Sequence, residues 1–182
     1  MSFFDKTRKS RLVRPAEKQE NISRFAGIYL DRLSIVANPS PEQKLTTLLA
    51  RSPASPVARA VIACADEIRG LDVHIEVAFC QAEPSELIAE WLELCQLPDP
   101  VATVRWARCP ALLDAHEQLV LGTSLSWYGD SMRRDPETRD AFETFDTFGA
   151  EGARRAATTF RALWTRTEPL LTRRALPAVG LP

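Results

Sequence analysis

Apolar residues in the middle of the chain follow two alternating spacings, one typical of helices and one typical of strands. Residues 57–68 repeat apolar side chains every three or four positions, and Gly70 follows where helices commonly end. Residues 71–80 alternate apolar and polar side chains, which predicts a half-buried strand. A second helix over residues 85–95 and a second strand over residues 101–107 follow. This order, with short connections, predicts crossover units on a mainly parallel sheet.

The segment before this unit is predicted to be mainly helical. Apolar residues repeat at helical spacing over residues 16–33, and residues 33–39 form either a short strand or the end of that helix. A capping-box pattern at residues 40–43 predicts a second helix that ends near residue 51. The prolines within residues 52–56 then predict a loop.

The segment after this unit begins with a predicted hairpin. Residues 116–121 and 125–128 are two short extended runs joined by three turn residues. A helix capped near Asp135 is expected to reach residue 148, and a final amphipathic helix is expected over residues 151–171. The whole pattern predicts a single α/β domain, a mixed sheet flanked by helices, with a hairpin and helices toward its C-terminus.

Charge and length divide the chain into three expected regions. These are a basic flexible arm over residues 1–15, a single α/β domain over residues 16–172 and a loose tail over residues 173–182. The net charge of −1 gives the whole protein no attraction to polyanions, so phosphate binding must come from a local cluster. The arm itself could contact nucleic acids weakly and non-specifically. No apolar run approaches the roughly 20 residues of a membrane span, so we expect a cytoplasmic protein.

Four cysteines lie in apolar segments, and no pair of them has the spacing of a metal site. We therefore expect reduced thiols that pack as small apolar side chains. We expect neither a bound metal ion nor a cofactor.

The predicted hairpin carries a dense set of polar groups at one end. Strand periodicity places His116 and Gln118 on one face near the end of the sheet, where α/β proteins place their ligand sites. The returning strand would bring Ser131 and the arginines after it back toward His116. Imidazole, hydroxyl, carboxylate and guanidinium groups together suit an oxyanion such as phosphate. The candidate catalytic residues are His116, Ser131 and Asp130, and the candidate ligand-binding residues are Gln118, Gly129, Arg133 and Arg134.

This arrangement resembles half of a phospholipase D-like domain. The motif of that family is His-x-Lys, four residues, Asp, six residues and Gly-Ser-x-Asn, on a strand hairpin. In this chain the places of His, Lys, Asp, Ser and Asn are taken by His116, Gln118, Thr123, Ser131 and Arg133. Only the histidine and the serine match. The segment ARAVIACADEIRGLDVHIEV also resembles the crossover that precedes the motif, so the resemblance covers residues 57–145.

The resemblance implies a phospholipase D-like fold. In the active members, one histidine attacks phosphorus and the histidine of a second half-domain protonates the leaving group, so a single half-domain implies a homodimer. Here Gln118 supplies no positive charge, and Thr123 supplies no carboxylate to orient His116. Our first hypothesis is therefore a non-catalytic or regulatory member that binds a phosphate-containing ligand.

Two alternatives stay open. One is an active phosphodiesterase or phosphotransferase that uses His116 as its nucleophile, with Ser131, Asp130 and Arg133 around it. The other is an α/β adaptor subunit whose basic arm and C-terminal helix contact a partner protein. The site proposal requires His116 and Ser131 to lie close together in the folded protein.

Overall fold

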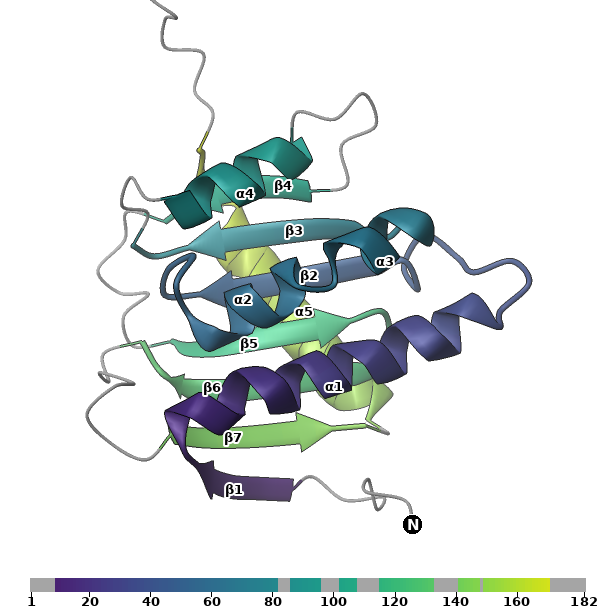
Figure 1. Cartoon of the computed structure of the whole chain (residues 1–182), viewed down its shortest axis with the longest axis horizontal. Helices are drawn as coiled ribbons and strands as arrows, with labels where there is room; N and C mark the ends of the chain where they lie inside the picture. Colours follow the sequence, from purple (N-terminus) through teal and green to yellow (C-terminus); the bar gives the residue numbers. More distant parts are fainter. Residues whose placement is uncertain are drawn as a thin grey trace, which may run out of the picture.

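The computed structural model describes residues 9–81, 86–95, 102–107, 115–132, 141–147 and 149–170. Over these ranges the chain forms one eight-stranded sheet with helices on both faces (Figure 1). The strands are β1 (Lys9–Val13), β2 (Leu45–Ala50), β3 (His74–Phe79), β4 (Ala102–Trp106), β5 (His116–Leu121), β6 (Leu125–Ser131), β7 (Ala141–Asp146) and β8 (Glu168–Pro169). The helices are α1 (Pro15–Ser34), α2 (Pro56–Ile62), α3 (Ala65–Gly70), α4 (Glu86–Cys95) and α5 (Ala150–Trp164).

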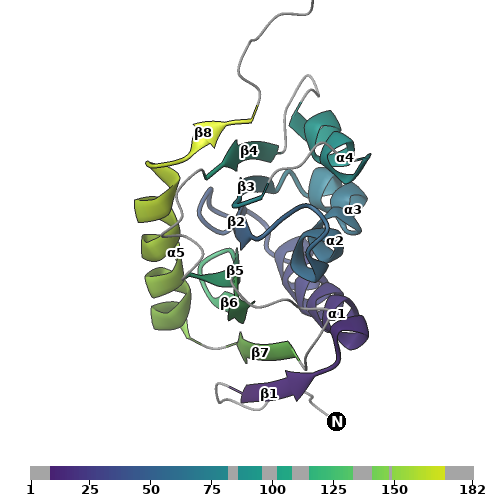
Figure 2. The same cartoon turned by 90° about the vertical axis from the view of Figure 1, so that its left-hand side faces the viewer.

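The sheet combines a parallel centre with antiparallel flanks. Its strand order is β1-β7-β6-β5-β2-β3-β4-β8. Strands β2, β3 and β4 are parallel, as the crossover pattern predicts, and the other neighbouring pairs are antiparallel. Helices α1 to α4 cover one face, and of the described helices only α5 covers the other (Figure 2). The predicted fold class, an α/β domain with a mixed sheet flanked by helices, is confirmed.

Helix α1 lies against the sheet with the apolar stripe that its sequence predicts. Ile22 and Phe25 of this stripe are fully buried. The Phe25 ring meets the Phe145 ring of β7 edge-to-face, with the ring centroids 5.0 Å apart. Because α1 ends at Ser34, the residues after it close the helix and do not form a strand.

The helix predicted over residues 40–51 is wrong. The capping box itself forms, because the Ser40 amide donates to Gln43 Oε1 at 2.8 Å and the Gln43 amide donates to Ser40 Oγ at 3.3 Å. After this single turn the chain enters β2, a central strand that is buried on both faces from Thr46 onward. Such a strand lacks apolar–polar alternation, so its sequence resembles a buried helix segment.

The helix predicted from Asp135 to residue 148 is wrong for residues 141–146, and residue 148 lies outside the described residues. There the chain forms β7, which pairs with β6 on one side and with β1 on the other. Phe142 and Phe145 are three positions apart, a spacing that fits a helix as readily as a strand end. Pairing with two neighbouring strands decides in favour of the strand, since each strand supplies hydrogen bonds to its backbone. Residues 135–140 lie outside the described residues.

The flexible arm predicted for residues 1–15 is wrong for Lys9–Val13. These residues form an edge strand that pairs with β7, from Lys9 opposite Phe145 to Val13 opposite Ala141. Basic residues are typical of solvated arms, but they are also common on edge strands, where they hinder pairing with other chains. Residues 1–8 and the predicted tail 173–182 lie outside the described residues.

Cys64, Cys80 and Cys95 are half-buried thiols that form no disulfide, in agreement with the prediction, and Cys109 lies outside the described residues. Burial raises the pKa of the Cys64 and Cys95 thiols, because a thiolate there would lose hydration. Across the described ranges, no helix is both long and apolar enough to cross a bilayer, and no cluster of three or more His, Cys, Asp and Glu residues could hold a metal ion.

Candidate functional site

The hairpin of β5 and β6, which is confirmed as predicted, brings His116 and Ser131 together at one edge of the sheet. The two residues are direct register partners, since β5 begins at His116 and β6 ends at Ser131. Strands β2 and β3 end at the same edge, on the left in Figure 1, which is the carboxyl end of the parallel strands. His116 is exposed and Ser131 is half-buried, so a ligand can reach this edge.

A bulge in β6 shapes this edge. Between two consecutive register pairs of the hairpin, Gly129 and Asp130 of β6 lie opposite only Glu117 of β5. An extra residue of this kind re-aims the side chains beside it, and such bulges are common next to functional sites. Here the bulge directs Asp130 toward α1, where it accepts a hydrogen bond from Lys18.

The imidazole of His116 is fixed by a backbone carbonyl. His116 Nδ1 lies 2.8 Å from the carbonyl oxygen of Gly129. Because a carbonyl oxygen can only accept, Nδ1 donates, and the neutral ring carries its lone pair on Nε2. Among the described residues no partner is found for Nε2. The imidazole is thus oriented with one nitrogen left for a ligand or a substrate.

Gly129 was predicted to allow close approach of a ligand, but its neighbour is an aromatic side chain. A Cβ atom at Gly129 would lie 2.3 Å from the ring of Trp127, which is fully buried. The missing side chain therefore makes room for Trp127. The contribution of Gly129 to the site is its carbonyl, which holds His116.

Gln118 was predicted to bind a ligand, but it is buried beneath α5. Its side chain is 4% exposed, and its Nε2 donates to the carbonyl oxygen of Ala156 at 3.2 Å. A buried amide needs such a partner, because an unpaired one would lose its hydration without compensation. The residue in the lysine place of the motif is thus directed at α5 and is not exposed at the sheet edge.

Asp130, the third predicted catalytic residue, is an ion-paired core residue. It is 3% exposed, and its Oδ2 lies 3.1 Å from Nζ of Lys18, which is fully buried on α1. Glu117 lies 3.8 Å from the same ammonium group, and the Trp127 ring centroid lies 5.3 Å from it. Breaking a buried pair of this kind leaves an uncompensated charge, so Asp130 is held in place and not presented to solvent.

The polar groups beneath the N-terminal half of α1 extend to β7. Glu143 is fully buried, and it accepts hydrogen bonds from Asn21 Nδ2 at 3.1 Å and from Trp127 Nε1 at 3.4 Å. We call this set the buried ionic cluster; its members are Lys18, Asn21, Glu117, Trp127, Asp130 and Glu143. The sequence carries a signal for it, because Lys18 lies four positions before Ile22 and so extends the apolar stripe of α1 by one turn.

We call the end of the sheet where His116 and Ser131 pair the His116 edge. Arg51, which follows β2, is a cation at this edge that the sequence did not predict. Its Nη2 donates to the carbonyl oxygen of Ser131 at 3.3 Å, and its backbone amide donates to Glu117 Oε1 at 3.2 Å. Arg51 thereby ties the end of β2 to both strands of the hairpin. It went unnoticed because residues 40–51 were predicted to be a helix, which hid its place at a strand end.

The remaining predicted positions fall into two groups. Arg133 and Arg134 lie outside the described residues. Thr123, in the aspartate place of the motif, lies in the turn between β5 and β6, at the opposite end of β5 from His116. A carboxylate at the opposite end of β5 could not orient His116. The absence of the motif aspartate at Thr123 therefore has no direct effect on the position of His116.

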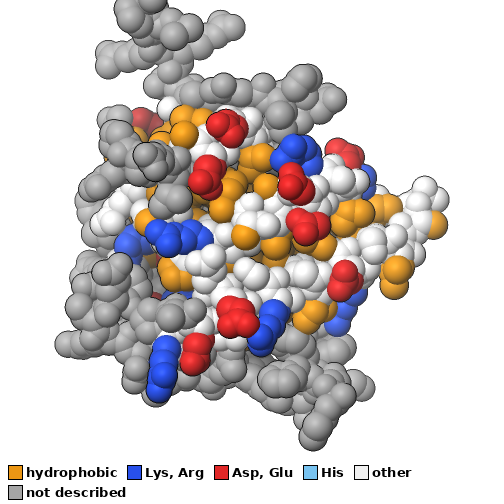
Figure 3. Space-filling model, viewed as in Figure 1, with side chains coloured by type: hydrophobic (Ala, Val, Ile, Leu, Met, Phe, Trp, Pro, Cys, Tyr) orange, Lys and Arg blue, Asp and Glu red, His pale blue; other side chains and the backbone are white. Residues whose placement is uncertain are grey.

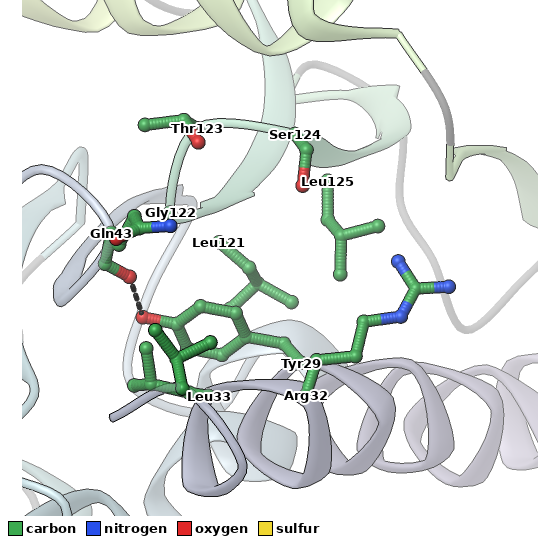
Figure 4. A pocket seen from close by; sticks show the side chains of 10 residues that line it. Tyr29, Arg32, Leu33, Gln43, Leu121, Gly122, Thr123, Ser124 and Leu125 are labelled. Atoms are coloured by element: carbon green, nitrogen blue, oxygen red, sulfur yellow. Dashed lines mark hydrogen bonds between the residues drawn. The ribbon is translucent and has the colours of Figure 1, made fainter. Parts of the chain in front are cut away.

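A small hollow lies at that opposite end, between the end of α1 and the β5–β6 turn (Figure 4). Within it the hydroxyl of Tyr29 donates to the carbonyl oxygen of Gln43 at 2.6 Å. Its cavity volume of about 80 Å³ is room for two or three water molecules, far below the several hundred Å³ of a ligand pocket. We therefore place no ligand there.

Comparison with known proteins gives matches at the level of structure only. No protein-family model matches the sequence, and no curated protein matches it at a significant level. The solved structure of NucT from Helicobacter pylori matches with a TM-score of 0.53 and 13% identity, covering 90% of this chain and 99% of that chain. Nuc from Salmonella typhimurium, a phospholipase D family member, matches with a TM-score of 0.57 and 8% identity, covering 91% and 100%.

A third match is TrmBL2, an archaeal chromatin protein described as showing a novel mode of DNA binding. Its TM-score is 0.53 at 10% identity, and the match covers 93% of this chain and 57% of that chain. At identities this low the likeness concerns the fold. The predicted phospholipase D-like fold is confirmed by these matches.

Proposed function

On the premise of a phospholipase D-like fold, we propose that this protein binds a phosphate group at the edge formed by His116 and Ser131 and does not cleave the phosphodiester bond. The observation that carries the proposal is the exposed imidazole of His116, which the Gly129 carbonyl orients beside Ser131. An imidazole with a bound Nδ1 offers Nε2 to a phosphate oxygen, and the serine hydroxyl can donate a second hydrogen bond.

Positive charge for the phosphate is proposed to come from Arg51. Its guanidinium already lies at the end of β6, 3.3 Å from the Ser131 carbonyl. Guanidinium groups bind phosphate oxygens in a bidentate fashion, which an amide such as that of Gln118 cannot do. Arg133 and Arg134, the predicted ligand-binding arginines, follow Ser131 closely in the chain and would add to the same charge.

Two contacts favour binding without cleavage. The side chain in the lysine place, Gln118, is neutral and bonded to α5. Asp130 is paired with Lys18 inside the core, so it cannot serve as an acid or a base at the edge. Loss of a single donor to the transition state commonly costs about 10²–10³ in rate.

We propose that the protein acts as a homodimer, in which two such edges face each other.

A second candidate function, an active phosphodiesterase, is favoured by one observation. Donation from Nδ1 to Gly129 leaves the Nε2 lone pair of His116 available as a nucleophile. Nε2 would attack phosphorus, a P–N bond would form, and the P–O bond to the leaving alcohol would break. The His116 of a second copy would protonate the leaving alkoxide. Water, which gives its proton to that same histidine, would then attack phosphorus and the P–N bond would break.

Thermal unfolding with inorganic phosphate and dimethyl phosphate tests the proposal, together with a turnover assay on bis(p-nitrophenyl) phosphate. We expect both anions to raise the Tm of the wild type, and His116→Ala and Arg51→Gln to lose that protection without any turnover in the wild type. His74→Ala is the matched control, since His74 is the other histidine and bonds Thr103 on β4. It should keep the protection.

The outcomes separate the hypotheses. Turnover that His116→Ala abolishes would favour the phosphodiesterase. Absence of anion protection in the wild type would overturn phosphate binding and leave the adaptor hypothesis, in which the basic N-terminal segment and the C-terminal helix contact a partner protein.

A further inference from the structure

Helix α5 carries a concentration of arginines on the side that faces away from the sheet. Its inward residues Ala153, Ala156 and Phe160 are buried. The exposed polar residues of α5 and the turn after it are one glutamate, near the start of the helix, and a set of arginines and threonines. We call this set the α5 arginine face; its members are Arg154, Arg155, Thr158, Thr159, Arg161, Thr165 and Arg166.

The spacing of these residues forms a row along the helix. Arg154 and Arg161 are seven positions apart, which places them on one line about 10 Å long. Arg155 and Thr158 lie beside this line, and Arg166 follows in the turn after α5 ends at Trp164. Duplex DNA carries one negative charge per roughly 1.7 Å of its axis, so a row of this length can meet several phosphates at once.

The contacts of these arginines within the protein leave Arg154, Arg155 and Arg166 available to a partner. Arg155 pairs with Glu151 one turn earlier, and Arg161 Nη1 lies 2.9 Å from Oε2 of Glu76 on β3. The Arg155–Glu151 pair is exposed and contributes only about 0–1 kcal/mol, so a phosphate can replace that carboxylate. The Glu76 side chain is only 15% exposed, so Arg161 stays paired with it. Within the described residues no hydrogen bond or ion pair is found for the Arg166 side chain, and the Arg154 side chain has only a charge interaction with Glu151.

The charge on the opposite helix layer is different. On α3 and α4 the exposed charged residues are mainly acidic: Asp66, Glu67, Arg69, Glu90 and Glu93. Figure 3, which views the face covered by α1 to α4, shows acidic and basic side chains interspersed. Because the whole chain has a net charge of −1, the excess of positive charge on α5 is local. A local positive surface attracts a polyanion even on a nearly neutral protein.

We propose that the α5 arginine face binds the phosphate backbone of a nucleic acid. The partner is a nucleic acid and not a membrane, because a helix at a lipid surface inserts large apolar side chains. The outward side of α5 presents arginine, threonine and alanine. Its large apolar residues pack inward: Phe160 is buried, and Leu163 and Trp164 are partly buried against the same core cluster. Arginine fits this partner better than lysine does, since its fork matches phosphate geometry. The proposal does not rest on phosphate binding at His116.

Fluorescence anisotropy with labelled random-sequence duplexes and single strands tests the proposal, over about 50 to 200 mM salt. The variant is Arg154→Gln with Arg166→Gln, two exposed residues whose replacement removes no hydrogen bond or ion pair found within the described chain. We expect wild-type binding with a steep salt dependence. The variant should bind about tenfold more weakly, and the slope of log K against log salt should fall by about two, since each phosphate contact contributes about 0.9.

The matched control is Arg59→Gln with Arg69→Gln, which removes the same charge from the opposite helix layer and should leave the slope unchanged. Equal losses in the two double variants would overturn the proposal, because net charge alone would then explain binding. Binding to phosphatidylserine vesicles but not to nucleic acid would also overturn it. If His116→Ala abolishes DNA binding while the α5 double variant binds as the wild type does, the surface is the His116 edge and not α5.

Discussion

At the scale of single residues, two side chains on the apolar stripe of α1 carry a polar group that the stripe does not predict. Lys18 continues the apolar stripe of α1, yet it ends in an ammonium group between two carboxylates. Tyr29 lies two turns after Ile22 on the same stripe, and its hydroxyl donates to the Gln43 carbonyl. Apolar periodicity locates both side chains in the core, but it says nothing about the polar atom at the tip of each one.

Lys18→Met should strongly destabilise the fold. It removes the cation and leaves Asp130 and Glu117 buried without it, which commonly costs about 3–5 kcal/mol. Chemical denaturation measures the free energy of unfolding. Lys44→Met is the control, because its pair with the exposed Asp72 is worth about 0–1 kcal/mol. Equal losses in the two variants would contradict this account.

Tyr29 should make the protein sensitive to alkaline pH. Burial raises the pKa of Tyr29 to about 12 from 10.0. Its contribution is therefore complete below pH 10, where the hydroxyl is protonated in both states, and it is lost as the pH rises toward 12. The loss amounts to about 3 kcal/mol at about 1.4 kcal/mol per pKa unit. Unfolding measured from pH 9 to 12 should show a shallower decline for Tyr29→Phe than for the wild type.

At the scale of elements, the parts that sequence predicted well are those whose signal is local. The hairpin is confirmed, and its first strand has the predicted bounds. The prediction succeeds because the turn residues and the two extended runs lie within a few positions of one another. β2 was mistaken for a helix, because a strand buried on both faces has no alternation. The pairing of His116 with Ser131 follows from the hairpin. The contact of Asp130 with Lys18 at the bulge does not follow from the hairpin, because these two residues are 112 positions apart.

The bulge gives Gly129 a role that alanine cannot fill. A Cβ atom there would lie 2.3 Å from the Trp127 ring, so the ring or the strand must move. We expect Gly129→Ala to cost about 1–3 kcal/mol and to displace the carbonyl that fixes His116. Nitrogen NMR of the imidazole would report the altered tautomer balance. Gly27→Ala on α1 is the control, with open space around the new methyl group; it should gain up to about 1 kcal/mol.

At the scale of the whole molecule, the two proposed binding surfaces lie on different parts of the fold. The His116 edge lies where the parallel strands end, and the α5 arginine face points away from the sheet. The fold class followed from the crossover units of the central segment, which alternate within short stretches of chain. The pairing of β1 with β7 joins residues more than a hundred positions apart, and no local pattern indicates it.

That pairing has a practical consequence for anyone who trims or tags this protein. β1 shields one side of β7, so deleting residues 1–13 would uncover a row of unsatisfied amide and carbonyl groups on β7. Uncovered edges of this kind recruit strands from other chains. We expect the truncated protein to self-associate in light scattering at concentrations where the full chain does not, whereas a truncation that stops at residue 8 should behave as the full chain does.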